Sequence, residues 1–283
     1  MKIVLFTALA LLAFAFNSIL CRLALAGGEA DAAGFTAVRL ASGAAALVLI
    51  ASVFGKTKAA AKSGHWLSAF LLFAYAICFS LAYLGLTAAT GALILFGSVQ
   101  LTMIAVSLAR GDRPSLTEWL GLAVAVCGLV YLVLPGLESP PLTSSLLMAA
   151  AGAAWGGYTL RGKGEGDPLS DTTGNFVRSL PFAAIALLIY LPQLQISAFG
   201  VLLAVISGAA ASGVGYAVWY AALKGLTSTR AAVFQLSVPV IAAALAVVIL
   251  DEKPTLHLLT AGLLILGGIA ITIAGRKPPE TSS

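Results

Sequence analysis

The sequence has few charged residues. Of its 283 residues, 10% are Asp, Glu, Lys or Arg, whereas 60% are hydrophobic, and the mean hydropathy is +1.02. A water-soluble domain of this length would need a charged outer surface, which 16 basic and 11 acidic side chains cannot provide. The composition therefore excludes a water-soluble domain and predicts a chain that has lipid as its solvent.

Residue types that carry enzymatic chemistry are also scarce. The two histidines, His65 and His257, lie outside the middle of any apolar run, and the three cysteines show neither metal-ligand spacing nor a disulfide framework. No Walker-type nucleotide loop occurs, and no Asp or Glu lies deep in an apolar run. The basic residues fall in short loops, not in a groove interleaved with aromatic residues. We therefore expect no catalytic residue, no cofactor, no metal and no nucleic-acid partner.

Hydrophobic runs fill most of the chain. A helix needs about 20 mostly apolar residues to cross a hydrocarbon core about 30 Å thick. Ten runs meet or approach this length, which predicts an all-α integral membrane protein with ten transmembrane helices. The runs are 3–25, 34–54, 66–86, 90–109, 117–134, 143–161, 172–191, 198–222, 229–250 and 256–275.

The basic residues gather at alternate ends of these runs. Short cytoplasmic loops of membrane proteins carry an excess of Lys and Arg. This rule predicts a multi-pass protein of the bacterial inner (plasma) membrane with both termini in the cytoplasm. The basic residues assigned to the cytoplasmic side are Lys2, Lys56, Lys58, Lys62, Arg110, Arg113, Arg161, Lys163, Lys224, Arg230, Arg276 and Lys277.

The two halves of the chain share residues at a nearly constant spacing. Arg178 follows Arg39 by 139 residues, and Gly268 follows Gly128 by 140. Five helices in each half is an odd number, so the second half enters the membrane in the opposite orientation. Inverted repeats of this kind build many secondary transporters and place the substrate site at the midplane, although chance similarity among apolar helices is the alternative. The predicted repeats are 1–138 and 139–283.

Two stretches of the second half carry a family likeness. They run from Ala221 through Ala232 and from Gln235 through Gly268, and the second contains Pro239 and the segment Asp251-Glu252-Lys253-Pro254. The first half repeats them more loosely from Thr87 to Gly128. On these residues the chain resembles the EamA branch of the drug/metabolite transporter superfamily, and within it the bacterial exporters of aromatic amino acids. The resemblance implies a ten-helix carrier made of two EamA-like repeats.

Bulky polar side chains inside apolar runs are candidates for the transport path. An unsatisfied polar group at membrane depth costs several kcal/mol, so such groups face the bundle interior or a wet cavity. Asn17, Gln100 and Gln235 are the candidates, with interhelical packing as the alternative role. Pro239 crowds the carbonyl group of Gln235, so we expect it to affect conformation, with a simple kink as the alternative.

Aromatic side chains recur at helical spacing and suit a cavity for solutes with an apolar side chain. Tyr75, Phe79 and Tyr83 are four residues apart, and the repeat places Trp155 opposite Phe16. Packing in the core or at the membrane interface is the alternative role. The expected aromatic lining residues are Phe16, Tyr75, Phe79, Tyr83, Trp155, Tyr158 and Trp219.

Three arginines lie near the ends of the expected helices. Arg22, Arg39 and Arg178 can each pair with a nearby acid, extend to the membrane interface, or attract a carboxylate. The sequence leaves these three roles open.

These features, together with the resemblance, predict a membrane transporter, not an enzyme. The transporter would export amino acids, aromatic or other apolar ones, or similar small metabolites by alternating access. Its partners would be a small-molecule substrate and the lipid bilayer, and the oligomeric state stays open, with a monomer compatible with the sequence. The alternatives are a carrier of another metabolite or drug in the same superfamily, an intramembrane enzyme, and a structural or sensory membrane subunit.

Overall fold

Helices make up nearly all of the chain that the structure describes. The structure is a computed structural model, and it describes residues 2–109, 115–134, 139–162, 166–226, 231 and 234–275. The first half forms α1 (Lys2–Ala26), α2 (Ala32–Val53), α3 (Thr57–Lys62), α4 (Trp66–Tyr83), α5 (Ala88–Ala109) and α6 (Leu116–Val133). The second half forms α7 (Leu142–Arg161), α8 (Pro168–Tyr190), the 3₁₀ turn η1 (Leu191–Gln193), α9 (Ala198–Ile206), the π-helical η2 (Ser207–Val214), α10 (Gly215–Leu223), α12 (Ser237–Leu250) and α13 (Leu256–Ala274).

Within the described residues, eight helical segments are long and apolar enough to cross a membrane. They are α1, α2, α4, α5, α6, α8 with η1, the continuous segment from α9 to α10, and α13. Helix α7 has 20 residues but a less apolar composition, and α12 has 14 residues. The expected all-helical, multi-pass membrane protein is therefore confirmed, whereas the count of ten spans stays a prediction.

The structure differs from the expected segments in two places. Helix α12 begins at Ser237, after a turn at Leu236, although the apolar run suggested a helix from 229. Part of that run lies outside the described residues. Helix α3 has only six residues, of sequence TKAAAK, and no apolar run marks it.

Polar residues in the loops fix where several helices begin. Asp31 accepts hydrogen bonds from the backbone N–H groups of Ala33 and Gly34 at the start of α2, and Thr255 accepts one at the start of α13. Ser115 and Glu118 form a capping box at the start of α6. These side chains satisfy backbone donors that have no partner within the helix. These side chains therefore mark the starts of α2, α6 and α13.

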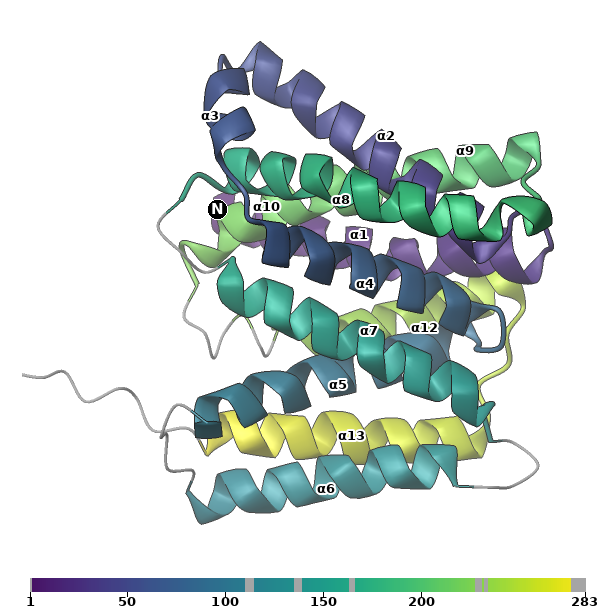
Figure 1. Cartoon of the computed structure of the whole chain (residues 1–283). Helices are drawn as coiled ribbons and strands as arrows, with labels where there is room; N and C mark the ends of the chain where they lie inside the picture. Colours follow the sequence, from purple (N-terminus) through teal and green to yellow (C-terminus); the bar gives the residue numbers. More distant parts are fainter. Residues whose placement is uncertain are drawn as a thin grey trace, which may run out of the picture.

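The helices run roughly along one direction, and their contacts across the two halves come in matching pairs (Figure 1). Helix α4 packs on α7, and α1 packs on α10. Likewise, α5 packs on α7, and α1 packs on α12. Helix α1 thus contacts α12 and the continuous segment from α9 to α10, and α7 contacts α4 and α5, which brings both halves together in the middle of the bundle.

Helices α6 and α13 pack closely at one edge of the bundle (Figure 1). A Cβ atom on Gly121 would lie 2.5 Å from the carbonyl oxygen of Gly268, and a Cβ atom on Gly128 would lie 2.8 Å from the side chain of Leu264. Small residues allow membrane helices to approach this closely, because lipid provides no hydrophobic force between them. The glycines therefore determine the contact between α6 and α13.

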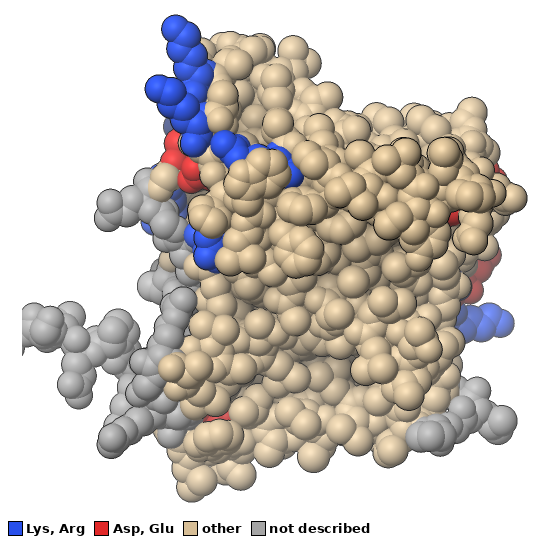
Figure 2. All heavy atoms as spheres, viewed as in Figure 1, with Lys and Arg blue, Asp and Glu red and all other residues tan. Residues whose placement is uncertain are grey.

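On the face that Figure 2 shows, charged side chains gather toward the ends of the bundle, and the surface between them is uncharged. Val248, Leu256 and Leu263 on α12 and α13 are 77% to 81% exposed. Lys and Arg side chains gather at the end of the bundle that carries α3, as Figure 2 shows. This distribution is typical of a protein whose sides contact lipid and whose ends contact water.

Candidate functional site

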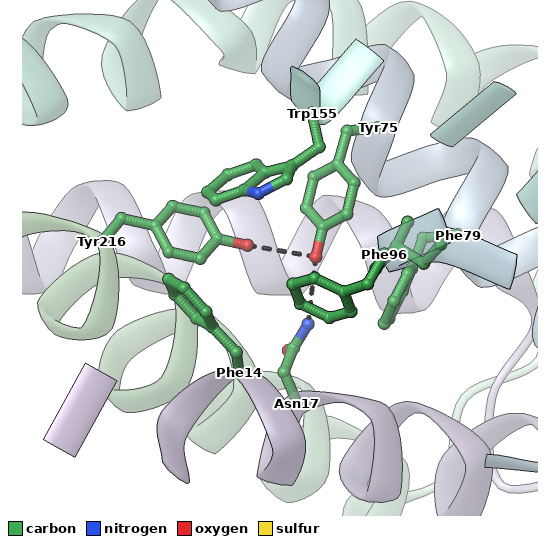
Figure 3. Close-up of a pocket in the computed structure, with 8 residues that line it drawn as sticks. Phe14, Asn17, Tyr75, Phe79, Phe96, Trp155 and Tyr216 are labelled. Atoms are coloured by element: carbon green, nitrogen blue, oxygen red, sulfur yellow. Dashed lines mark hydrogen bonds between the residues drawn. The ribbon is translucent and has the colours of Figure 1, made fainter. Parts of the chain in front are cut away.

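A small pocket lies in the middle of the bundle, between helices of both halves. Its free volume is about 10 Å³, which is room for about one water molecule. The lining comes from α1, α4 and α5 of the first half and α7 and α10 of the second. The lining residues are Phe14, Asn17, Tyr75, Phe79, Leu95, Phe96, Trp155 and Tyr216 (Figure 3).

Aromatic rings form most of the pocket wall. The ring of Phe14 meets the rings of Trp155, Tyr216 and Trp219 edge to face, with centroid distances of 5.8, 5.7 and 5.7 Å. The rings of Trp155 and Tyr216 lie 4.5 Å apart, and those of Trp155 and Tyr75 lie 5.1 Å apart. Edge-to-face and tilted arrangements of this kind are favoured by the ring quadrupoles. The wall therefore presents ring faces and edges that suit an apolar or aromatic group.

The polar atoms of the pocket meet at the hydroxyl group of Tyr75 (Figure 3). The amide Nδ2 of Asn17 donates to this hydroxyl oxygen at 3.3 Å, and the hydroxyl groups of Tyr75 and Tyr216 lie 3.2 Å apart. The carbonyl Oδ1 of Asn17 accepts a hydrogen bond from Ser207 at 2.6 Å. The pocket therefore combines an apolar wall with one polar corner.

Arg39 lies directly behind this polar corner. Its Nη2 donates to the hydroxyl oxygens of Tyr75 and Tyr216 at 3.1 and 3.0 Å, and its Nε donates to Ser212 Oγ at 3.0 Å. Its Cζ lies 5.2 Å from the ring centroids of both Tyr75 and Phe79, within the range of cation–π attraction. The polar corner is therefore next to a positive charge, although none of the described residues that line the pocket is charged.

The π-helical segment η2 positions two of these polar contacts. Ser207 and Ser212 both lie in η2, and they bind Asn17 of α1 and Arg39 of α2. Gly208 lets η2 approach α2, because a Cβ atom there would collide with the carbonyl oxygen of Arg39. Short π-helical insertions occur frequently at functional sites. This one turns two serines of the same segment toward the middle of the bundle.

Most of the residues expected from the sequence lie in or just behind the pocket. Asn17, Tyr75, Phe79 and Trp155 line it. Three others are buried one layer behind and contact lining residues: Tyr83 meets the ring of Phe79, Tyr158 meets Trp155, and Trp219 meets Phe14.

Gln100 and Gln235 are buried but are not among the pocket-lining residues. Their Nε2 atoms have no hydrogen-bond partner among the residues that the structure describes. A role for either glutamine in the transport path stays a prediction.

Two expected positions need correction. The side chain of Phe16 is 42% exposed and lies on the outside, because two residues along a helix turn a side chain by about 200°. Phe14 occupies the inner face in its place.

Pro239 lies in the first turn of α12, after the turn at Leu236, and not inside a continuous helix. Proline is tolerated at that point, since a first-turn N–H has no partner within the helix.

Four residues that line the pocket were not among the expected lining residues. Tyr216 lies three residues before the expected Trp219 in the same helix, whereas Phe14, Leu95 and Phe96 lie in runs that are apolar on every side. In such runs hydrophobic periodicity does not distinguish the inner face from the lipid-facing one.

A hydrogen-bonded contact joins four helices at one end of the bundle. Arg22 on α1 approaches Glu252, just beyond α12, with 3.4 Å between Nε and Oε1. Arg22 Nη1 also donates to the carbonyl oxygen of Tyr83 at the end of α4. Glu252 accepts a hydrogen bond from the backbone N–H of Ala88, at the start of α5, at 2.9 to 3.0 Å. Glu252 lies 230 residues away from Arg22 in the sequence, so it is a partner that only the structure reveals.

The other end has an ion pair between Lys56 and Asp167, with 2.7 Å between Nζ and Oδ1. Burial raises the pKa of Asp167, but hydrogen bonds from Lys56 and Ser170 outweigh burial and lower the pKa from 3.8 to about 2. Arg178 at this end donates to backbone carbonyl groups, including that of Ala61 on α3. Each end of the bundle thus has its own polar contacts.

The fold and the pocket together define a multi-pass membrane protein with a small site enclosed by both halves of the chain. Residues 142–274 match the EamA-like transporter family. The chain is 49% identical over 275 residues to the protein PA1977 of Pseudomonas aeruginosa, a match that covers 97% of this chain and 96% of that protein. A crystal structure with 19% sequence identity has the same fold, with a TM-score of 0.70 and coverage of 100% of this chain and 99% of the other. The chain therefore belongs to the EamA-like transporter family.

Proposed function

We propose that this protein exports amino acids with aromatic or other apolar side chains, or similar small metabolites, across the bacterial inner membrane. The observation that carries the proposal is the central pocket, which combines a wall of aromatic rings with one polar corner and is shared by both halves of the chain. An apolar side chain suits the wall, and the polar groups of an amino acid suit the corner. The likeness of the sequence to exporters of aromatic amino acids supports the same substrate class.

The arrangement of the helices supports alternating access between two inverted five-helix repeats. The matched contacts of α1 with α10 and α12, and of α7 with α4 and α5, are what a two-fold relation between 1–138 and 139–283 would produce. In such carriers one half rocks against the other around a fixed midplane site. The pocket lies where the halves meet.

The size of the pocket supports an occluded state of the transport cycle. A free volume of about 10 Å³ is too small for an amino acid. The aromatic rings must therefore move apart to admit a solute. Arg22 and Glu252 hold one end closed, and Lys56 and Asp167 join helices at the other.

The charge distribution supports a cytoplasmic location for the end that carries α3. The basic side chains in Figure 2 gather there, and short cytoplasmic loops are rich in Lys and Arg. Single cysteines at Lys58 and Lys253 should then be labelled from opposite sides of the membrane. Labelling of both from outside by an impermeant reagent would contradict this orientation.

Counterflow in proteoliposomes tests the function itself. Vesicles loaded with unlabelled L-phenylalanine should accumulate labelled L-phenylalanine only when they contain the protein, and the labelled compound should be recovered unchanged. A carrier exchanges its solute without consuming it, whereas an enzyme converts it. Absence of exchange for every amino acid tried would contradict the proposed substrate class.

Trp155 tests the pocket. Truncation of Trp155 to Ala should reduce exchange of L-tryptophan and L-phenylalanine roughly threefold to tenfold more than exchange of L-alanine, because a ring contact is lost. Trp66→Ala is the matched control, since Trp66 lies at the outer surface near a helix end. A stable Trp155→Ala protein with unaltered selectivity would remove this residue from the site.

A further inference from the structure

Arg39 is a buried charge, and it has no acidic partner among the residues that the structure describes. Its side chain is 1% exposed, although it lies on the membrane helix α2. The ion pairs in the described part of the chain are Arg22 with Glu252 and Lys56 with Asp167, and neither includes Arg39. An unpaired guanidinium group is strongly disfavoured in an apolar interior, so buried charges are normally paired. Arg39 therefore needs an explanation that packing alone does not provide.

The described residues around Arg39 do not provide acceptors for all of its donors. Nε and Nη2 bind Ser212, Tyr75 and Tyr216, but Nη1 has no hydrogen-bond partner among the described residues. The hydroxyl groups of Tyr75 and Tyr216 share a single hydrogen bond, so one of them keeps a proton for which these residues provide no acceptor. The oxygen of Tyr75 already receives the amide of Asn17 as well. The polar corner thus has a surplus of donors and a positive charge.

We propose that Arg39, together with the hydroxyl groups of Tyr75 and Tyr216, binds the carboxylate of the transported solute. A carboxylate only accepts hydrogen bonds, carries the opposite charge, and can accept two parallel bonds from a guanidinium group. It therefore supplies what this corner lacks. The inference rests on the proposed function, since it assigns one end of the solute that the aromatic wall holds.

The positions of these side chains determine how the bound solute is oriented. The two hydroxyl groups face into the pocket in Figure 3, and Arg39 binds both from behind. A carboxylate at the hydroxyl groups reaches the guanidinium group when the rings move apart. The apolar part of the solute then lies against Phe14 and Trp155. The rings of Tyr75 and Phe79, each 5.2 Å from Arg39 Cζ, stabilise the charge when no solute is bound.

Matched ligand pairs on the purified full-length protein test this assignment. L-phenylalanine carries a carboxylate that L-phenylalaninamide lacks, and benzoate and benzamide repeat the contrast without an amino group. By calorimetric titration, the wild type should bind each carboxylate about tenfold more tightly than its amide, which is the effect of one charge-assisted hydrogen bond. Arg39→Gln should bind both members of each pair with similar affinity.

Three further variants keep the test decisive. Ser212→Ala removes the acceptor of Nε but keeps the charge, so the preference for carboxylates should survive. If Arg39→Gln does not fold, Arg39→Lys keeps the charge but loses the planar fork, and Tyr216→Phe removes one hydroxyl donor. Arg39→Lys and Tyr216→Phe should each lower the preference for carboxylates about threefold, in line with a weakened hydrogen bond. A purely structural Arg39 predicts lower thermal stability with an unchanged preference in every folded variant.

The outcomes separate this inference from the proposed function. A wild type that does not distinguish carboxylate from amide in either pair would overturn the inference, as would a folded Arg39→Gln protein with an undiminished preference. If benzoate binds in an Arg39-dependent manner but no amino acid exchanges in vesicles, the carboxylate site stands and amino-acid export fails. If amino acids exchange while Arg39→Gln keeps the preference, export stands and the site assignment fails.

Discussion

The pair of α6 and α13 and the centre of the bundle are held together in different ways. Between α6 and α13, glycines bring two backbones into contact, with Gly121 against Gly268. In the centre, the contacts are aromatic rings and buried polar groups around Phe14, Asn17 and Arg39. Both regions lie in the same membrane protein, so lipid as a solvent does not explain the difference.

The difference follows from what each region has to do. Contacts between glycines fit in one geometry only, because backbone atoms cannot move aside. Rings and hydroxyl groups can exchange one set of partners for another when the halves move. Buried polar groups are also costly unless satisfied, so they are expected where they bind something. The α6–α13 pair is therefore suited to be a fixed part of each state, and the centre to be the part that changes.

Removing a ring from the centre should have the largest effect on stability. Phe14→Ala leaves a cavity among Trp155, Tyr216 and Trp219, and such a cavity costs about 3–5 kcal/mol in soluble proteins. Phe16→Ala is the matched control, because Phe16 lies two residues away on the same helix and faces outward. Thermal unfolding in one detergent should show a large decrease in Tm for Phe14→Ala and a small one for Phe16→Ala. Equal decreases would contradict the placement of Phe14.

A methyl group between α6 and α13 should have the next largest effect. In Gly121→Ala the added Cβ would lie 2.5 Å from backbone and side-chain atoms of Gly268 and Thr272, and overpacking of this kind costs about 1–3 kcal/mol. Gly267→Ala on α13 is the control, since its Cβ would meet nothing within 4 Å. The Tm should fall for Gly121→Ala and stay the same or rise slightly for Gly267→Ala. The same Tm for both variants would show that the close contact does not hold the pair.

The rigid parts of the fold were the easier ones to predict. The apolar run 256–275 matches α13 at Leu256–Ala274, and the run 117–134 matches α6 at Leu116–Val133. The turn at Leu236 and the π-helical segment η2 were not predicted. Both lie inside apolar runs, and η2 makes its polar contacts with residues far away in the sequence, namely Asn17 and Arg39.

The pocket was predicted in kind but not in detail. Helical spacing selected Tyr75 and Phe79, which line it. Phe16 was selected in place of Phe14 because the spacing of the repeat placed it opposite Trp155. Helix α1 is apolar on every side, so hydrophobic periodicity could not show that Phe16 faces outward. Arg39 lies near the start of an apolar run, and only the packing of η2 and α4 against α2 shows that it is buried.

The contacts at the two ends add a third kind of contact to the comparison, because each joins residues of both halves on one side of the changing centre. Glu252→Gln removes the charge that faces Arg22 and weakens the hydrogen bond to Ala88. A hydrogen bond to a charged group contributes about 1.5–3 kcal/mol. The fully buried Cys21, next to Arg22 in α1, should therefore react with a maleimide about tenfold faster in a Cys78→Ala, Cys127→Ala background.

Lys56→Gln at the opposite end is the control for this variant, and it should leave the reactivity of Cys21 unchanged. If Glu252→Gln also leaves that reactivity unchanged, the contact of Arg22 with Glu252 does not hold its end of the bundle closed. If Glu252→Gln lowers the Tm without faster labelling of Cys21, the contact of Arg22 with Glu252 has a structural role only.

The pair of Lys56 and Asp167 should have the smallest effect, and one that depends on pH. Both side chains are partly exposed, at 42% and 39%, and surface pairs contribute about 0–1 kcal/mol. The folded pKa of Asp167, about 2, lies below its ordinary value of 3.8. The stabilisation is therefore fully present above the ordinary value and is lost as the pH falls through about 2.

Lys56→Gln should accordingly lower the Tm slightly at pH 7 and have a clearly smaller effect near pH 2, where the carboxyl group of Asp167 is already partly protonated even with its partner in place. Lys58→Gln is the control, because Lys58 makes no ion pair in the described part of the chain, and it should leave the Tm unchanged at both values. Measuring all three proteins in the same detergent removes the general effect of acid on the fold. If the loss from Lys56→Gln were as large at pH 2 as at pH 7, the lysine would stabilise this end by packing. The two ends would then be stabilised differently, and only the contact of Arg22 with Glu252 would hold its end of the bundle closed through charge.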